Sequence, residues 1–279
     1  MDYIEVQFIV HPVDPGREVI IALLAEAGYE SFEETVDGLK AYIDKNRYQK
    51  EVVQEIVDNI AATINATFIA GPIETINWNE EWEKNYNPVV IDNRCAVIAP
   101  FHNSINEVDY EIVIEPKMSF GTAHHATTSL MISYLLELNP DGMQVMDMGC
   151  GTGVLAILAR KMGAQRVVAI DNYIWAYENA MENALRNNCK DIRVIHGDSS
   201  SITGEDFDLF IANINRNVLL DEIPVYHKYI KPGGILLLSG FYDYDENLIT
   251  AKACENNFVY QSAKTKENWV AAYYRKQLD

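Results

Sequence analysis

Strands and helices alternate strictly along the second half of the chain, from residue 144 onward. Short apolar runs predict the strands, and apolar residues at helical spacing predict the helices between them. The expected strands cover residues 145–148, 166–170, 192–196, 207–214 and 235–240, and the expected helices cover 154–162, 173–187 and 218–229. Such alternation is typical of a parallel sheet with right-handed crossovers, so the predicted fold class is a doubly wound α/β domain.

The alternation changes near the end of the chain. After an expected helix at 246–255, strand-like segments at 258–265 and 269–275 are separated only by Lys266, Glu267 and Asn268. So short a connection predicts a hairpin. The parallel sheet is therefore expected to finish with an antiparallel strand.

A smaller set of elements precedes this domain. Its expected strands cover 3–10, 30–36, 38–43 and 66–76, and its expected helices cover 17–29 and 48–64. The order βαββαβ predicts a small α+β, ferredoxin-like domain over residues 1–76. A polar connector follows, in which Trp78 and Trp82 are expected to pack between domains. Residues 77–92 are thus a predicted linker, and 93–279 form the larger domain.

A glycine-rich turn joins the first strand of the α/β region to its first helix. Gly149, Gly151 and Gly153 follow the buried strand directly. Glycines at such a turn let the backbone approach a ligand closely, and the helix start offers unpaired N–H donors. The turn predicts a nucleotide ligand. Because Gly151, Gly153 and Ala156 also satisfy the relaxed GxGxxA pattern, an NAD-binding domain is an alternative.

Polar side chains stand at the ends of the next three strands. Asp171 ends the second strand, where a carboxylate can accept hydrogen bonds from both hydroxyls of a ribose. Asp198 ends the third strand, Asn213 ends the fourth, and Lys231-Pro232-Gly233-Gly234 precedes the fifth. Each alone has a structural explanation, such as a turn cap. Together their order and spacing resemble the class I S-adenosylmethionine-dependent methyltransferases, whose seven-stranded sheet also ends in an antiparallel strand.

A loop before the first strand of this sheet carries a more specific signal. It reads Phe120-Gly121-Thr122-Ala123-His124-His125-Ala126-Thr127-Thr128. This loop, the tryptophan-bearing connector, the glycine turn and Ala212-Asn213-Ile214 resemble the PrmA family, the methyltransferases of large-subunit ribosomal protein eleven. The resemblance covers nearly the whole chain. It implies that Thr128, Gly149, Asp171 and Asn213 contact S-adenosylmethionine, to which the motifs add Gly151, Gly153 and Asp198.

The resemblance also implies a reaction. It is the methylation of lysine ε-amines and an N-terminal α-amine, with the small first domain recognising the protein substrate. We assign Asn213 as the catalytic residue, because its side chain and nearby carbonyls can accept hydrogen bonds from the target amine and direct its lone pair at the methyl group. No strong protein base is evident, so water is expected to take the proton.

Two departures from the family pattern affect the site. Ala123 replaces a glycine usual in the loop, which restricts the backbone if this position needs a positive φ. Asn215-Arg216 stands where small apolar residues are usual, so substrate contacts there are expected to differ. His124 and His125 leave two interpretations open, a general base or histidines that order the loop, and the second is preferred. No Cys, Asp or Glu stands at metal-ligand spacing beside them, so no metal is predicted.

The composition limits the kind of partner and the cellular location that we expect. The net charge is −19, from 41 acidic and 22 basic residues. Such a chain repels a phosphate backbone, so we expect a basic protein partner rather than direct nucleic-acid binding. The same acidity would also serve solubility alone. The four cysteines form no CxxC pair and are expected to be reduced thiols. No apolar run approaches eighteen residues and no signal peptide is evident, so no membrane partner and a cytoplasmic location are expected.

Three other functions compete with methylation of a ribosomal protein. A glutamine methyltransferase would carry an NPPY signature at the fourth strand end, which Asn213-Ile214-Asn215-Arg216 lacks. A class I methyltransferase that acts on another protein or on a small molecule stays possible on the motifs alone. An NAD-dependent protein or a non-catalytic nucleotide-binding module would share the glycine turn and the ribose-binding carboxylate.

Overall fold

The chain divides into two units, Met1–Trp82 and Glu83–Asp279. The computed structural model describes residues 3–73, 83, 85–117, 119–203 and 206–278. Trp78 and Trp82, for which we expected packing between domains, lie outside the described residues. The second unit begins inside the expected linker, because residues 89–91 form a strand that pairs within this unit.

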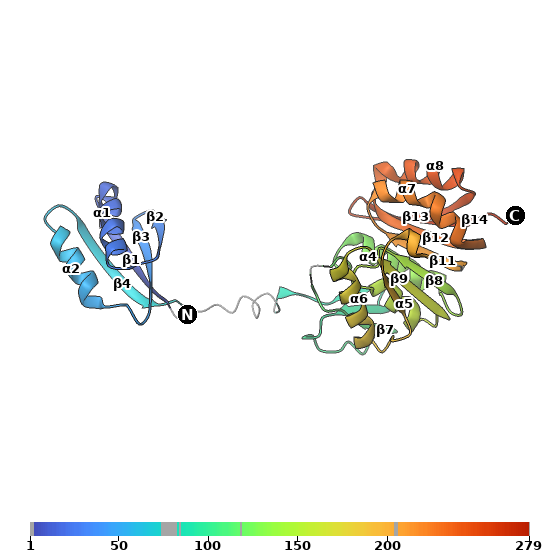
Figure 1. Cartoon of the computed structure of the whole chain (residues 1–279), viewed down its shortest axis with the longest axis horizontal. Coiled ribbons are helices and arrows are strands. Elements are labelled where there is room, and N and C mark those ends of the chain that lie inside the picture. Colours follow the sequence, from blue (N-terminus) through green and yellow to red (C-terminus); the bar gives the residue numbers. More distant parts are fainter. Residues whose placement is uncertain (1–2, 74–82, 84, 118, 204–205, 279) are drawn as a thin grey trace. The chain divides into compact units, whose positions relative to one another are not determined.

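The first unit is a four-stranded antiparallel sheet with two helices (Figure 1). Its elements are β1 (Tyr3–His11), α1 (Val13–Glu26), β2 (Ser31–Thr35), β3 (Gly38–Asp44), α2 (Lys50–Ile60) and β4 (Asn65–Pro72). The strands lie in the order β2-β3-β1-β4. Alternate residues of β1, such as Val6 and Phe8, are buried with Leu24 of α1 and Val53 of α2, so both helices cover one face of the sheet.

The second unit begins with a small three-stranded sheet. It consists of β5 (Val89–Ile91), β6 (Cys95–Ile98) and β7 (Tyr110–Val113), in which β6 pairs antiparallel with β5 and parallel with β7. Of these three strands, β5 lies within residues 77–92, the expected linker.

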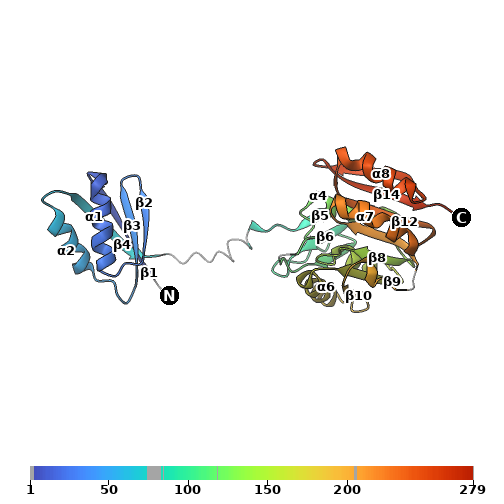
Figure 2. The same ribbon diagram turned by 45° about the horizontal axis from the view of Figure 1, so that its top comes forward.

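A seven-stranded sheet forms the centre of the second unit, in the order β10-β9-β8-β11-β12-β14-β13 (Figure 2). The first five are parallel, and β14 runs antiparallel between β12 and β13. The strands are β8 (Gln144–Met148), β9 (Arg166–Asp171), β10 (Arg193–His196), β11 (Phe207–Asn213), β12 (Ile230–Tyr242), β13 (Phe258–Lys266) and β14 (Trp269–Lys276). The predicted α/β class is confirmed.

Helices cover both faces of this sheet, because its central strands are apolar on both sides. One face packs against α4 (Ala126–Leu138), α5 (Val154–Lys161) and α6 (Ile174–Arg186), and the other against α7 (Arg216–Tyr226) and α8 (Glu246–Glu255). Three single turns of 3-10 helix, η1 (Ser199–Ser201), η2 (His227–Tyr229) and η3 (Asp243–Asp245), complete the connections. None of the helices in the described part of the chain has the length and apolar character needed to cross a bilayer.

The parallel arrangement brings the carboxyl ends of β8, β9, β10, β11 and β12 to one edge of the sheet. In open α/β sheets, ligands bind at this edge. Sequence reasoning placed β12 at 235–240, but it spans Ile230–Tyr242, because it continues through the predicted Pro-Gly-Gly turn and beyond Gly240. This extension places Phe241 and Tyr242 beyond the carboxyl edge of the sheet.

Candidate functional site

A cavity of about 650 Å³ opens at the carboxyl edge of the seven-stranded sheet. Its walls come from the ends of β8, β9, β11 and β12, from the residues after β10, from the loop before α4, and from the starts of α6, α7 and β14. The lining includes Phe120, His125, Thr127, Gly149, Gly151, Asp171, Tyr173, Trp175, Asp198, Asn213, Asn215, Glu222, Gly240 and Trp269. Five of the predicted cofactor residues are thus brought together: Gly149, Gly151, Asp171, Asp198 and Asn213.

The glycine turn has backbone angles that other residues rarely adopt. Gly149 and Gly151 have φ of 72° and 54°. A Cβ on Gly149 would lie 2.2 Å from Cγ2 of Ile214, and one on Gly151 would lie 2.2 Å from the carbonyl oxygen of Phe120. The absence of a Cβ at these two positions therefore makes room for the side chain of Ile214 and the backbone of Phe120. The sequence argument had assigned their lack of a Cβ to the approach of a ligand alone.

Gly153 and Thr128 do not line the cavity as the described residues form it. Gly153 is the N-cap of α5. Thr128 is completely buried, and its Oγ1 lies 3.5 Å from Nδ2 of Asn213, at the outer limit of a hydrogen bond. Thr128 therefore stands behind Asn213, whereas the neighbouring Thr127 faces the cavity.

Asp171 is held in place by the backbone. Its Oδ2 accepts a hydrogen bond from Gly151 N at 2.9 Å, and its Oδ1 accepts one from Tyr173 N at 3.0 Å. The side chain is buried but lines the cavity. An ionised carboxylate can accept about four hydrogen bonds, so acceptor capacity remains for a ligand with two adjacent hydroxyl groups.

Asp198 stands one strand further toward the sheet edge. Its Oδ1 accepts hydrogen bonds from Oγ and N of Ser200 at 2.6 and 2.9 Å. These two bonds lower the pKa of Asp198, the hydroxyl contributing most. Asp198 is therefore an ionised cap of η1 that also faces the cavity.

Asp147, in β8, lies beneath the glycine turn and was not singled out from the sequence. It is almost fully buried, and its Oδ2 accepts a hydrogen bond from Ala156 N in α5 at 3.1 Å. Burial raises the pKa of Asp147 to about 7, with a further contribution from the charge of Asp171 and an opposing one from the Ala156 hydrogen bond. The side chain fastens the strand to the helix that follows the turn.

Three side chains of the cavity wall contain buried oxygens that have no hydrogen-bond partner among the described residues. Two of them are Oδ1 of Asn213, at the end of β11, and Oε2 of Glu222, in α7, and a third such oxygen is Oγ of Ser119, before the loop. Nearly all buried polar atoms in proteins have partners, so such acceptors indicate donors that a ligand supplies. Glu222 was not identified from the sequence, in which it is one acidic residue among many.

The loop before α4 is fastened to the glycine turn. Thr152 N donates to Phe120 O at 2.9 Å, and Thr152 Oγ1 donates to Gly121 O at 2.7 Å. Ala123 adopts φ of 67° and is buried. The position therefore has the left-handed backbone that a glycine adopts without strain, and Ala123 tolerates it at a cost of about 1–2 kcal/mol.

The two loop histidines differ in their surroundings. His124 is exposed, and its Nε2 lies 2.9 Å from Asn87 O. His125 lines the cavity and caps α4, since its Nδ1 accepts a hydrogen bond from Thr127 N at 3.3 Å. The same Nδ1 lies 2.8 Å from Oγ1 of Thr127. These contacts order the loop.

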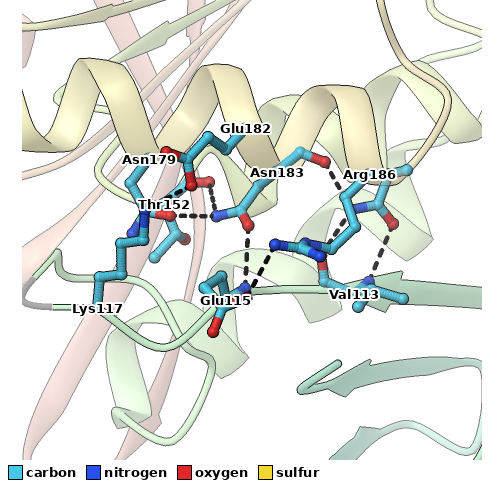
Figure 3. A network of polar contacts seen from close by, with 9 residues as sticks. Val113, Glu115, Lys117, Thr152, Asn179, Glu182, Asn183 and Arg186 are labelled. Atoms are coloured by element: carbon cyan, nitrogen blue, oxygen red, sulfur yellow. Dashed lines mark hydrogen bonds and ion pairs between the residues drawn. The ribbon is translucent and has the colours of Figure 1, made fainter. Parts of the chain in front are cut away.

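A row of asparagines on α6 joins the loop, the glycine turn and β7 (Figure 3). Asn183 Nδ2 donates to Thr152 O at 3.0 Å, and Asn183 Oδ1 accepts from Glu115 N at 2.9 Å. Asn187 exchanges two hydrogen bonds with the backbone of Val113. Sequence reasoning missed these residues. Their signal was the spacing of Asn179, Asn183 and Asn187, which places three asparagines on one helix face.

Reactive thiols and metal clusters do not contribute to the site. The four cysteines are free, and burial raises the pKa of Cys150 in the glycine turn, which disfavours the nucleophilic thiolate. Within the described ranges, no three His, Cys, Asp or Glu side chains gather in a way that could hold a metal ion.

Comparisons with known proteins agree with this geometry. Residues 18–277 match the family model described as ribosomal protein L11 methyltransferase (PrmA). The chain is 44% identical to the ribosomal protein L11 methyltransferase of Porphyromonas gingivalis, over 93% of this chain and 90% of that protein. It is 41% identical to the enzyme of the same name from Phocaeicola vulgatus, over 98% and 99%.

A solved structure shares the fold of the larger part of the chain. The ribosomal protein L11 methylase of Lactobacillus delbrueckii subsp. bulgaricus matches with a TM-score of 0.64 and 26% identity, covering 69% of this chain and all of that chain.

Proposed function

Since the chain belongs to the ribosomal protein L11 methyltransferase family, we propose that its cavity binds S-adenosylmethionine and that the enzyme transfers the cofactor's methyl group to amino groups of ribosomal protein L11. The observation that carries the proposal is the convergence of an oriented ribose-type carboxylate, Asp171, and an unsatisfied acceptor, Asn213 Oδ1, on one cavity. The targets are lysine ε-amines and an N-terminal α-amine.

The residues present fit the cofactor. Asp171 has acceptor capacity for the two ribose hydroxyls, because its own backbone contacts use only part of its lone pairs. Gly149 and Gly151 leave the floor of the cavity open beside it. Asp198 lies next along the sheet edge, beyond the ribose position, where it can face the adenine end. Gly153 acts through the start of α5, and Thr128 through Asn213.

The sulfonium of the cofactor supplies an electrophilic methyl group, so the protein has to align a nucleophile with it. A lysine amine is the difficult partner. Fewer than about one in a thousand is neutral at pH 7, which corresponds to about 4 kcal/mol. The chain's own residues would have to hold the target nitrogen with its lone pair toward that methyl group and leave a path by which its proton reaches water.

Asn213 is proposed to orient this amine. Its Nδ2 lies toward Thr128, so its Oδ1 remains to accept an N–H of the target. His125 is a weaker candidate for the base, because its Nδ1 is engaged by both N and Oγ1 of Thr127. Water is therefore proposed to accept the proton that the amine loses.

The first unit is proposed to be a ferredoxin-like module that recognises the protein substrate. Its element order and its strand order β2-β3-β1-β4 support the classification. The net charge of −19 supports a basic protein as the partner, rather than nucleic acid.

Labelled cofactor provides the test of the reaction. We expect label on purified ribosomal protein L11, and calorimetry should show binding of S-adenosylhomocysteine in preference to NAD. Label on a small molecule or another protein, with none on L11, would refute the substrate assignment. Tighter binding of NAD would refute the cofactor.

A shortened chain tests the role of the first unit. Residues 83–279 contain the whole seven-stranded sheet and its cavity. We expect this fragment to bind S-adenosylhomocysteine within a few-fold of the full chain and to lose L11 methylation, because a second contact no longer raises the local concentration of the target. An undiminished kcat/KM would show that the first unit does not hold the substrate.

A further inference from the structure

The cavity has two chemically different sides. The glycine turn, Asp171 and Asp198 lie at the ends of β8, β9 and β10. On the other side, Asn213 ends β11, Gly240 lies in β12, and Trp269 begins β14. If the ribose binds at Asp171, the protein substrate has to approach from the second side.

Aromatic rings form a continuous series on this second side. Ring centroids are separated by 5.1 Å from Phe120 to His125, 4.7 Å from His125 to Trp269, 3.9 Å from Trp269 to Tyr242, and 5.3 Å from Tyr242 to Tyr244. Phe120, His125 and Trp269 line the cavity, whereas Tyr242 and Tyr244 continue beyond its lining. The series therefore leads from the cavity to the surface.

The outer rings stand on a fixed support. Tyr242 and Trp269 are opposite one another in the β12–β14 ladder. Tyr244 lies in η3, where Asp243 N donates to Asn268 O at 2.9 Å. Asp245, which is buried, forms an ion pair of 2.7 Å with Arg216 at the start of α7. Tyr244 stacks on Tyr242 through one face, yet the residue is 72% exposed.

Charged side chains lie close to the exposed ring of Tyr244. Asp243 is exposed beside Tyr244, and the positive charge of Arg216 is engaged by Asp245. A cationic side chain lying over an aromatic face gains about 0.5–2 kcal/mol, and a neighbouring carboxylate adds to the attraction. An exposed ring, Tyr244, beside the half-buried Tyr242 and an acidic neighbour therefore favours lysine or arginine side chains.

We propose that Tyr242 and Tyr244 form a docking surface for the basic segment that flanks the target amine of the protein substrate. The inference rests on the proposed methyl transfer to a protein. It adds a contact outside the cavity, where an extended segment lies along the two rings while its target side chain enters past Trp269. Continuity of the rings with the cavity identifies the occupant as the substrate chain itself.

Kinetics of Tyr244→Ala with purified L11 test the proposal. We expect KM for L11 to rise about 5- to 20-fold, with kcat at saturation and the affinity for S-adenosylhomocysteine unchanged, because the ring contacts only the flanking segment. Tyr244→Phe should keep the KM of the unmodified enzyme, whereas Tyr244→Leu should resemble Tyr244→Ala. Leu248→Ala, at an exposed position of α8, is the matched control.

A short acetylated lysine amide serves as a second substrate that lacks flanking residues. With it, Tyr244→Ala should show the same kcat/KM as the unmodified enzyme. An unchanged KM for L11 in Tyr244→Ala would overturn the proposal, and so would a Tyr244→Leu variant with normal KM, since an aliphatic side chain cannot bind a cation through a ring face. If the unmodified enzyme does not label L11 at all, it is the proposed function that fails.

Discussion

The two sides of the cavity differ in how far the protein has satisfied its own polar groups. On the side of β8, β9 and β10, Asp171 accepts two backbone N–H groups and Asp198 accepts two groups of Ser200. On the side of β11 and β14, Asn213 Oδ1 has no partner among the described residues, and aromatic rings form the wall. The protein's own groups satisfy the carboxylates of the first side, whereas the second side keeps an acceptor for which we propose the substrate as partner.

Substitutions on the side of β8, β9 and β10 should therefore weaken cofactor binding, whereas substitutions on the side of β11 and β14 should lower turnover. Asp171→Ala should weaken the binding of S-adenosylhomocysteine by about 2–4 kcal/mol, because a charged acceptor of paired hydrogen bonds is lost. Titration calorimetry measures the change. Asp171→Asn, which keeps one acceptor oxygen, should lose less. Unchanged affinity in both variants would remove Asp171 from the cofactor site.

Asn213→Ala tests the opposite side. Turnover should fall about a hundredfold while cofactor affinity stays within a few-fold, because orientation of the amine matters most in the transition state. Single-turnover rates at saturating cofactor give the measurement. Asn247→Ala, at an exposed asparagine of α8, is the control. If saturation restores the full rate, Asn213 binds only the cofactor and the two sides do not differ as proposed.

Substitution of Asp147 tests how a buried carboxyl group beneath the glycine turn affects the stability of the fold. Because burial raises its pKa to about 7, the folded chain keeps this proton to higher pH than the unfolded chain does. The stability gained is fully present below the ordinary carboxyl range and is lost as the pH rises through about 7.

The measurement is urea denaturation at two pH values. Between pH 5 and pH 8, the free energy of unfolding should fall by about 2–3 kcal/mol more in the unmodified protein than in Asp147→Asn. Asp221→Asn, at an exposed position of α7, controls for the loss of one carboxylate. Parallel curves for the unmodified protein and Asp147→Asn would mean that Asp147 is ionised throughout.

Substitution of Thr128 should give the smallest change in activity. It tests whether this residue acts on the cofactor or through Asn213. The family resemblance implies a cofactor contact, whereas the buried Thr128 Oγ1 lies against Asn213 Nδ2. Thr128→Val should therefore lower kcat about 3- to 10-fold and leave cofactor affinity unchanged, while Thr128→Ser should resemble the unmodified enzyme. A Thr128→Val variant with weakened cofactor binding would place this hydroxyl on the cofactor side.

The sequence predicted the site residues on the side of β8, β9 and β10 better than those on the side of β11 and β14. Asp171, Asp198 and the glycines follow strands whose apolar runs are evident, and parallel strands necessarily bring such ends together. Trp269 was not identified as a site residue, because its place beside His125 depends on the pairing of β14 with β12, which no local pattern specifies. Buried Asn183 was missed because the helix pattern was interpreted from apolar positions alone.

The insertion of β14 between β12 and β13 has a consequence for the order of events during synthesis. Trp269 closes the wall begun by Phe120, and β14 pairs with both of its neighbours, so the cavity cannot be complete until translation has passed residue 276. Residues 3–73, by contrast, contain all four strands of the first sheet and can fold as soon as they leave the exit tunnel. A nascent chain therefore exposes a finished first unit long before it possesses a working catalytic centre.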